Sequence, residues 1–190
     1  MLVAMTTGAY DARRNVEKPT WWPWWGASRV VPTLGGVLRI DRATYDGIVA
    51  HAKRDHPDEA CGVVAGPEGS DRPERLVEMV NAAGSPTFYE FDSTDLLHLY
   101  KEMDERDEEP VVIYHSHTAT EAYPSRTDIG LAMEPGAHYV LVSTREHGNT
   151  DGPVEFRSYR IVDGEVTEEE VTVTEPDTGP ETDGPAPATD

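Results

Sequence analysis

The hydrophobic pattern changes its period along the middle of the chain, and each change predicts an element. Residues 37–40 alternate as a strand does, and Asp41 follows them as the N-cap of a predicted helix that His56-Pro57 ends. A second helix is predicted over residues 93–107, with Ser93 as its cap. In both helices the apolar residues recur at helical spacing and are expected to face a core: Tyr45, Ile48, Val49 and Ala52, then Leu96, Leu97, Tyr100 and Met103.

Extended patterns predict further strands between and after these helices. No internal repeat is visible, and strands outnumber helices without alternating strictly with them. The pattern therefore predicts a single-domain α+β fold in which helices sandwich a β-sheet, in place of a doubly wound parallel fold. The predicted strands cover residues 61–65, 75–80, 88–91, 111–114, 139–143, 155–161 and 165–173.

The two ends of the chain lack this periodicity, so the predicted domain covers residues 36–173. Residues 1–35 hold all four tryptophans, clustered around Pro23, and are expected to be a disordered extension or the product of a start site assigned too early. An aromatic docking motif is the alternative, since adjacent exposed indoles often mark an interface. Residues 174–190 are expected to form a disordered acidic tail, because they offer too little apolar area to offset their ordering entropy.

Composition narrows the classes of function. A length of 190 residues suits one domain, and a net charge of -20 repels phosphate backbones and anionic lipids, so nucleic acid and membrane partners are not expected. The sequence has no signal core and no run of the roughly 20 apolar residues that span a bilayer, which favours a cytoplasmic protein. Cys61 is the only cysteine, so any metal must be held by imidazole and carboxylate groups.

Two histidines follow the apolar strand predicted over residues 111–114. Residues two apart in an extended chain point the same way, so His115 and His117 present both imidazoles on one face. Asp128 lies one turn into a helix that Ser125 begins, and its carboxylate can point back toward the strand end. Two imidazoles and a carboxylate are typical protein ligands of a catalytic zinc ion, whose fourth position stays open for water.

Each of these residues also has a structural interpretation. Histidine pairs are often solvated or hydrogen-bonded core residues, and Ser125 with Asp128 forms a capping box at a helix start. Asp128 can complete the capping box and bind a metal at the same time. The joint pattern His-x-His-x7-Ser-x2-Asp, however, would arise by chance in roughly one such sequence in a thousand, and this favours the metal site.

A metallohydrolase also needs a group that moves protons without binding the metal. Glu59 is the candidate, because it precedes the apolar strand at residues 61–65 and shares a face with Cys61, where an apolar side chain would be usual. The alternative for Glu59 is a surface glutamate at a strand start, and Cys61 itself is expected to be a small buried apolar residue. The remaining histidines lack metal-like spacing and are expected to be structural or solvated, with no second metal: His51, His56, His98, His138 and His147.

Together these residues resemble the complete JAMM signature of the MPN+ (Mov34/PAD-1) metalloproteases. The resemblance covers about residues 36–173, the size of the small prokaryotic members, and implies the MPN fold, which is cytidine-deaminase-like. It implies one Zn²⁺ per chain, with His115, His117 and Asp128 as the ligands. It further implies that Glu59 holds and deprotonates the bound water, and that Ser125 stabilises the oxyanion of the tetrahedral intermediate.

Residues 60–66 and 114–128 look closest to a bacterial JAMM subfamily that takes part in cysteine biosynthesis. Its members remove cysteine from the C-terminus of a small ubiquitin-like sulfur-carrier protein, so the resemblance implies a carrier ending in Gly-Gly as the partner. An extended Gly-Gly segment can thread a narrow groove, and residues 88–91 are expected to form one wall of it. The alternatives are a broader isopeptidase that strips ubiquitin-like modifiers from lysines, and a non-catalytic MPN scaffold.

Overall fold

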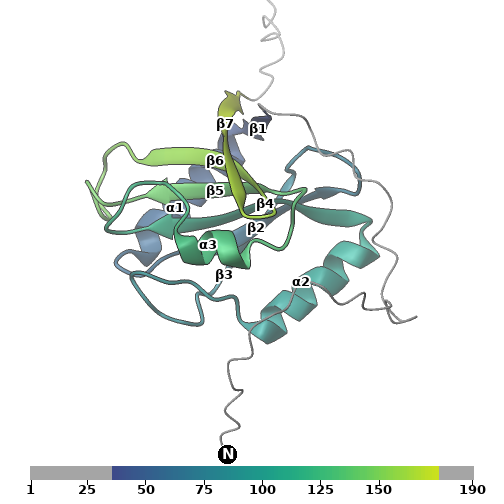
Figure 1. Ribbon diagram of the computed structural model, residues 1–190, viewed down its shortest axis with the longest axis horizontal. Helices are drawn as coiled ribbons and strands as arrows, with labels where there is room; N and C mark the ends of the chain where they lie inside the picture. Colours follow the sequence, from purple (N-terminus) through teal and green to yellow (C-terminus); the bar gives the residue numbers. More distant parts are fainter. Residues whose placement is uncertain (1–35, 176–190) are drawn as a thin grey trace, which may run out of the picture. The chain divides into compact units, whose positions relative to one another are not determined.

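The computed structural model describes residues 36–175 (Figure 1). The predicted extension at residues 1–35 lies outside the described residues, and so does the predicted acidic tail except for Thr174 and Glu175. The strands are β1 (Val37–Asp41), β2 (Cys61–Pro67), β3 (Arg75–Met79), β4 (Glu108–His117), β5 (His138–Ser143), β6 (Glu155–Val162) and β7 (Glu165–Thr174). The helices are α1 (Arg42–Asp55), α2 (Ser93–Glu105) and α3 (Arg126–Leu131).

The strands form one mixed sheet of seven strands in the order β1-β7-β6-β5-β4-β2-β3. The pairs β1–β7 and β4–β5 are parallel, whereas the other neighbours are antiparallel. Parallel neighbours need a crossover connection, and α3 lies in the one that joins β4 to β5. The carboxyl end of β4 therefore leads directly into the loop that carries α3.

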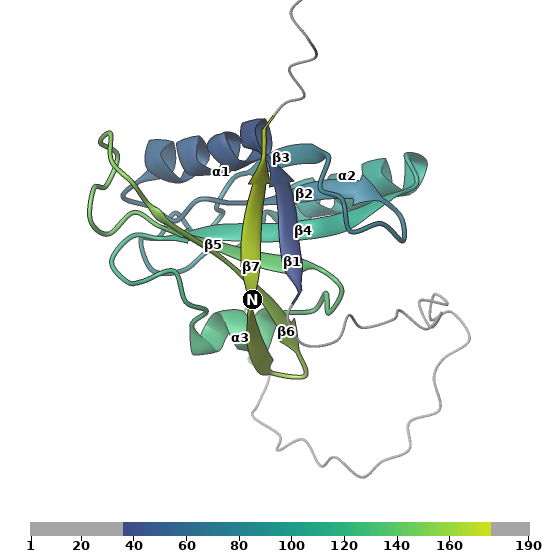
Figure 2. The same ribbon diagram turned by 90° about the horizontal axis from the view of Figure 1, so that it is seen from above.

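Helices cover both faces of the sheet because side chains alternate along its strands. In β2, Val64 packs against Ile48 of α1, whereas Cys61 and Val63 pack against Leu99 of α2. In β5, Leu141 belongs to a third cluster that the end of α3 covers. Figure 2 shows α1 along one side of the strands and α3 on the other. The predicted α+β fold with a sandwiched sheet is confirmed.

The second predicted helix differs at its start and on its buried face. Asp92, not Ser93, is the N-cap, and its side chain accepts hydrogen bonds from the backbone N–H groups of Thr94 and Asp95. Leu97 is 54% exposed, while Leu99 is only 4% exposed. Leu99 lies on the same helix face as Leu96, Tyr100 and Met103, which pack together in one cluster. Leu97 follows Leu96 directly, and because successive residues of a helix are rotated by about 100°, its side chain points away from that face.

The strand predicted over residues 88–91 is wrong. Only two isolated bridges form there, Asn81 with Phe91 and Ser85 with Phe88. The amide side chain of Asn81 takes the place of a regular ladder, since its Oδ1 atom accepts from the backbone N–H of Glu90 at 3.1 Å and its Nδ2 atom donates to the carbonyl of Phe88 at 3.0 Å. Residues 81–92 thus form an ordered loop beside β2.

No helix among residues 36–175 is long and apolar enough to cross a membrane.

Candidate metal centre

His115 and His117 lie at the carboxyl end of β4, and both are buried with their rings on one face of the sheet. Asp128 reaches them from the first turn of α3, and its side chain is 13% exposed. The structure thus brings together the three residues that the sequence predicts as metal ligands. Within residues 36–175, they are the one group of His, Cys, Asp and Glu side chains found close enough to hold a metal ion.

The spacing of the three donor atoms fits a tetrahedral zinc site. The Nε2 atoms of His115 and His117 are 3.2 Å apart, and Oδ2 of Asp128 lies 3.4 Å from the first and 3.5 Å from the second. Ligand bonds of about 2.0–2.1 Å at tetrahedral angles place donor atoms about 3.3 Å from one another. One ion can therefore contact all three atoms without a rearrangement of the side chains.

His117 is held in the orientation that a metal ligand needs. Its Nδ1 atom lies 2.8 Å from the carbonyl oxygen of Glu121 and 3.0 Å from Oγ1 of Thr120. A carbonyl oxygen can only accept, so Nδ1 carries the proton and the lone pair of Nε2 points toward the other two donors. The ring of His115 is fixed differently, by stacking on Tyr89 with ring centroids 4.4 Å apart.

Asp128 is fixed by the start of α3. The backbone N–H of Ser125 donates to Oδ2 of Asp128 at 2.6 Å, and the backbone N–H of Asp128 donates to Oγ of Ser125 at 3.2 Å. This is the predicted capping box, and the carboxylate that completes it also faces the two histidines. The structural and the metal-binding interpretations of Asp128 are therefore compatible in the folded chain.

Glu59 lies beside these residues because of the pairing between β2 and β4. Cys61 pairs with His115 in the antiparallel register, so Glu59, two residues earlier, lies opposite His117 and faces the same side. The side chain of Glu59 is buried, with 6% of the residue exposed. The alternative of a surface glutamate is wrong.

Four hydrogen bonds fix the backbone around Glu59. The N–H of Ser116 donates to the carbonyl of Ala60 at 2.9 Å, and the N–H of Ala60 donates to Oγ of Ser116 at 2.9 Å. Glu59 donates its own N–H to the carbonyl of Ser85 at 3.0 Å and accepts a bond from Nδ2 of Asn81 at 2.9 Å. The position of Glu59 thus depends on both β4 and the loop at residues 81–92.

The two carboxyl groups of the site, Glu59 and Asp128, have pKa values shifted in opposite directions. Burial raises the pKa of Glu59 to about 7; the negative charge of Asp128 adds to this increase, and His117 opposes it. Burial would also raise the pKa of Asp128, but hydrogen bonds with His115 and His117 outweigh it and hold that pKa well below its usual value. The site therefore holds one carboxylate that stays ionised and one that can exchange a proton near neutral pH.

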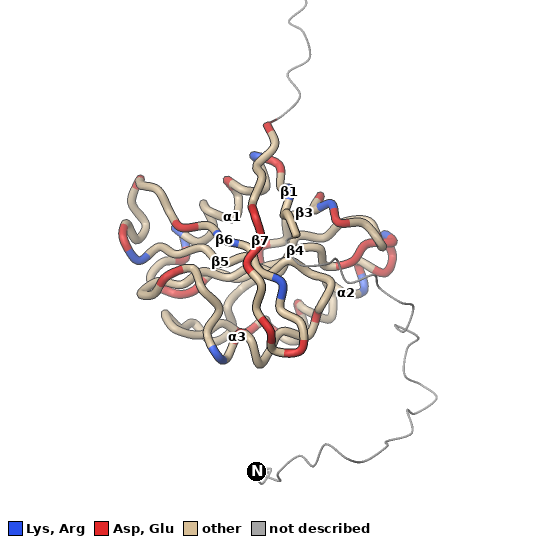
Figure 3. The backbone as a smooth tube through the Cα atoms, turned by 45° about the horizontal axis from the view of Figure 1, so that its top comes forward, with Lys and Arg blue, Asp and Glu red and all other residues tan. Residues whose placement is uncertain are grey.

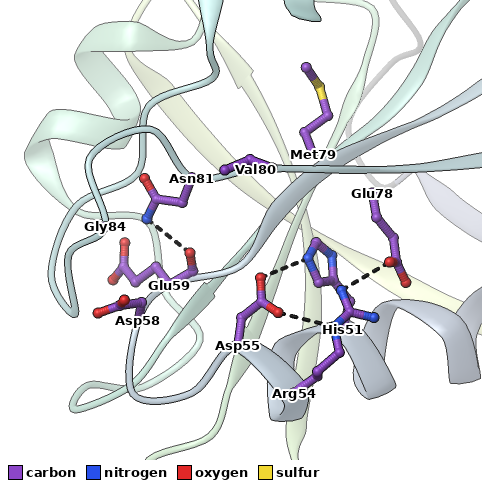
Figure 4. Close-up of a pocket in the computed structure, with 10 residues that line it drawn as sticks. All are labelled: His51, Arg54, Asp55, Asp58, Glu59, Glu78, Met79, Val80, Asn81 and Gly84. Carbon is purple, nitrogen blue, oxygen red and sulfur yellow. Dashed lines mark hydrogen bonds and ion pairs between the residues drawn. The ribbon is translucent and has the colours of Figure 1, made fainter.

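A cavity of about 420 Å³ opens on one flank of Glu59, between the end of α1 and β3 (Figure 4). Asp55 of this cavity binds Nε2 of His51 at 3.0 Å, and Glu78 binds the guanidinium of Arg54 at 2.9 Å. The pairing of His51 agrees with its predicted structural role. The lining residues are His51, Arg54, Asp55, Asp58, Glu59, Glu78, Met79, Val80, Asn81 and Gly84.

Several contacts of the site were not predicted from the sequence. The stacking of Tyr89 on His115, the carbonyl of Glu121 and the amide of Asn81 all belong to loops whose conformation depends on contacts distant in sequence. Neither spacing nor hydrophobic period marks them. Tyr89 does lie in the segment that was predicted to form a wall of the substrate groove.

Comparison with known proteins places this geometry in a family. The model of the prokaryotic homologs of the JAB domain matches residues 41–162, which include all the residues of the site. Over 139 residues the chain is 65% identical to a CysO-cysteine peptidase of Mycobacterium tuberculosis, covering 73% of this chain and 92% of that protein. It is 31% identical over 111 residues to a desampylase of Haloferax volcanii, covering 56% of this chain and 80% of that protein.

A solved structure agrees with the fold. The solution structure of protein DSY2949 from Desulfitobacterium hafniense superposes with a TM-score of 0.62 at 28% identity, covering 74% of this chain and 94% of that one. The predicted resemblance to the JAMM proteins is confirmed, and the chain belongs to the family of prokaryotic homologs of the JAB domain.

Proposed function

We propose that this chain is a zinc hydrolase of the cytoplasm that cuts the amide between the C-terminal glycine of a small ubiquitin-like sulfur carrier and a cysteine. The observation that carries the proposal is the convergence of His115, His117 and Asp128 beside the buried carboxyl of Glu59. The 65% identity to a CysO-cysteine peptidase, over 92% of its length, supports this substrate. The free cysteine that is released would serve cysteine biosynthesis.

The donor set supports zinc as the metal. Two neutral imidazoles and one carboxylate, all within 3.5 Å of one another, suit a divalent ion that prefers nitrogen and oxygen donors in tetrahedral geometry. Zinc held there would polarise a carbonyl group and lower the pKa of a nearby water. Three protein ligands leave one position for the substrate or water.

Glu59 moves the proton in this proposal. Its carboxylate accepts a proton from the attacking water, whose oxygen forms the new bond to the glycyl carbonyl carbon. Glu59 then gives that proton to the nitrogen as the C–N bond breaks, so a carboxylic acid and a free amine leave. A pKa of about 7 suits both steps, because a group that titrates near the working pH can accept and donate a proton with similar ease.

Ser125 stabilises the negative charge on the carbonyl oxygen. Its Oγ atom already accepts the backbone N–H of Asp128, so the hydroxyl hydrogen remains available for donation. Ser125 is exposed at the start of α3, where a substrate can reach it. A donor positioned before the reaction begins needs no reorganisation when charge develops.

A hydrolysis assay followed by mass spectrometry tests the proposal. Purified protein of measured metal content is incubated with a sulfur-carrier protein ending in Gly-Gly-Cys, with and without a chelator. We expect the carrier to lose one cysteine, and the chelator to abolish this loss until zinc is restored. An intact carrier in the presence of the zinc-loaded protein would refute the proposed substrate.

A broader isopeptidase that releases ubiquitin-like modifiers from lysines is the second candidate. The 31% identity to a desampylase favours it. A carrier joined to lysine through an isopeptide bond separates the two candidates in the same assay. Zinc content measured on the purified protein addresses the remaining alternative, a non-catalytic scaffold.

A further inference from the structure

The leaving group of the proposed reaction has a charge that needs a partner. This inference rests on the proposed function. A single cysteine on the carrier keeps a free α-carboxylate next to the nitrogen of the scissile amide, whereas a lysine side chain has no carboxylate near that nitrogen. In a chain of net charge -20, the acidic residues of the protein repel such an anion, and a basic side chain beside it would offset that repulsion. Figure 3 shows how acidic residues outnumber basic ones along the described chain.

The flank of the site on the side of Glu59 does not offer that cation. Asp55, Asp58 and Glu78 line the cavity there, and Arg54 is its only arginine or lysine. Arg54 already contacts Glu78 at 2.9 Å and Asp55 at 3.2 Å, so its charge is balanced (Figure 4). A carboxylate placed in this cavity would meet more negative than positive charge.

The turn that holds Ser125 and Asp128 also holds an arginine without a partner among the described residues. Arg126 is the first residue of α3, directly after Ser125 and two residues before Asp128, and it is exposed. Within residues 36–175 it makes neither an ion pair nor a side-chain hydrogen bond, unlike most of the arginines in that range. The arginines with a carboxylate partner are Arg42, Arg54, Arg72, Arg75, Arg145, Arg157 and Arg160.

The other cations without a partner in the described range lie elsewhere. Arg39 is on β1, Lys101 is on α2 and Arg106 directly follows α2. Neither of these elements contributes a residue to the metal centre. Arg126 is thus the free cation that belongs to the same turn as Ser125 and Asp128.

We propose that Arg126 binds the α-carboxylate of the departing cysteine and so selects a single C-terminal residue over a lysine-linked protein. A guanidinium can hold a carboxylate through two parallel hydrogen bonds, which fixes orientation as well as charge. The acidic cavity and Arg126 then act together, because one repels the carboxylate from the side of Glu59 and the other attracts it toward α3. Arg126 is a specificity-determining residue in this scheme and takes no part in proton transfer.

The test compares two substrates that differ only in this charge. One is the carrier ending in Gly-Gly-Cys, and the other is the same carrier ending in Gly-Gly-cysteinamide, whose carboxylate is replaced by a neutral amide. We expect the zinc-loaded wild type to cleave the acid with a kcat/KM about tenfold higher than the amide. In Arg126→Gln, the kcat/KM for the carrier ending in Gly-Gly-Cys should fall to the value for the cysteinamide carrier. The kcat/KM for the cysteinamide carrier should equal that of the wild type. Arg126→Lys should restore part of the preference.

The matched control is Arg106→Gln, which removes another exposed and unpaired arginine and should keep the full preference. Thermal unfolding of each variant confirms that it is folded. Equal cleavage of both substrates by the wild type, or an unchanged preference in Arg126→Gln, overturns the role of Arg126 and leaves the proposed function intact. Failure of the zinc-loaded wild type to cleave either substrate overturns the proposed function, and this inference with it.

Discussion

Glu59 occupies a position where a carboxylic acid is costly to ionise. It lies opposite His117 with its side chain buried, and burial raises its pKa to about 7. An apolar residue would be the more stable choice there, and the chain keeps a titratable group instead. Such a group is expected where proton transfer is needed, which is why Glu59 carries more functional information than the exposed carboxylates around it.

Replacing Glu59 by glutamine tests that role at the level of one atom. Glu59→Gln keeps the size of the side chain and leaves His115, His117 and Asp128 unchanged, so we expect zinc to stay bound. The kcat should fall by about 10²- to 10⁴-fold, because glutamine cannot accept a proton. Thermal stability should not decrease, since a neutral amide is easier to bury than a carboxylate. Metal analysis, kinetics and thermal unfolding measure the three effects.

Glu68→Gln is the matched control, because Glu68 is an exposed carboxylate in the turn after β2. It should leave kcat and zinc content unchanged. Full activity in Glu59→Gln would show that another group transfers the proton.

At the scale of elements, the pattern predicted a strand at the position of each of β1 to β7 and predicted α1, because burial of one face imposes a clear period. The pattern at residues 93–107 predicted a helix but misplaced its cap, since Asp92 and Ser93 are both good capping residues and only the backbone decides between them. Residues 88–91 alternate like a strand, but the amide of Asn81 supplies the hydrogen bonds that a neighbouring strand would have made. The predicted metal ligands and Ser125 could be recognised because their spacing is local, from His115 to Asp128, whereas Glu59 could be recognised only as a carboxylate next to an apolar strand.

The loop at residues 81–92 should affect catalysis through Asn81. Its amide binds the carbonyl of Glu59 on one side and the backbone of Phe88 and Glu90 on the other. We expect Asn81→Ala to lower the free energy of unfolding by about 1–3 kcal/mol, because these partners lose their hydrogen bonds. The kcat should fall as well, since Glu59 is then less firmly placed.

Denaturant unfolding and steady-state kinetics measure both effects. Asn149→Ala provides the comparison, because Asn149 is exposed in the loop between β5 and β6. Equal stability and kcat in Asn81→Ala and Asn149→Ala would mean that the loop does not position Glu59.

At the scale of the whole molecule, a buried ionic cluster joins β5, β6 and β7 far from the metal centre. Glu169 contacts Nδ1 of His138 at 2.6 Å and Nε of Arg160 at 2.8 Å, and Asp71 reaches both of these residues at 3.0 Å. Burial alone would raise the pKa of Glu169, but the hydrogen bond and charge of His138, together with Arg160, lower it below 4.5. The cluster links the loop between β2 and β3 to the other end of the sheet.

This cluster predicts a loss of stability in acid. A carboxyl group whose pKa is lower in the folded state binds protons more readily when the chain is unfolded, so its contribution is present above pH 4.5 and is lost as the pH falls. Asp71, whose pKa is also lowered, acts in the same direction. The free energy of unfolding should therefore decrease as the pH falls below about 5, as measured by denaturant titration.

Glu169→Gln should make the free energy of unfolding depend less on pH in this acid range. It should also lower the free energy of unfolding at every pH, because Arg160 then loses its buried charged partner. A slope that is the same in Glu169→Gln and the wild type would assign the acid sensitivity to other carboxylates. Glu59 affects stability in the opposite direction and at higher pH. Because its pKa is raised in the folded state, its contribution to the free energy of unfolding is present in acid and is lost as the pH rises through about 7.

The pairing of β2 with β4 limits where the sequence can gain or lose residues during evolution. Because Glu59 and His117 face each other across that pair, a slip of one residue would turn Glu59 toward α1 and disconnect it from the histidines. The register is irregular between Val64 and Ala65, farther along the same pair, where a length difference is already absorbed. Insertions and deletions can thus accumulate beyond this point, in the connection from β2 to β3, while the end of the β2–β4 pair that holds Glu59 and His117 keeps a fixed register.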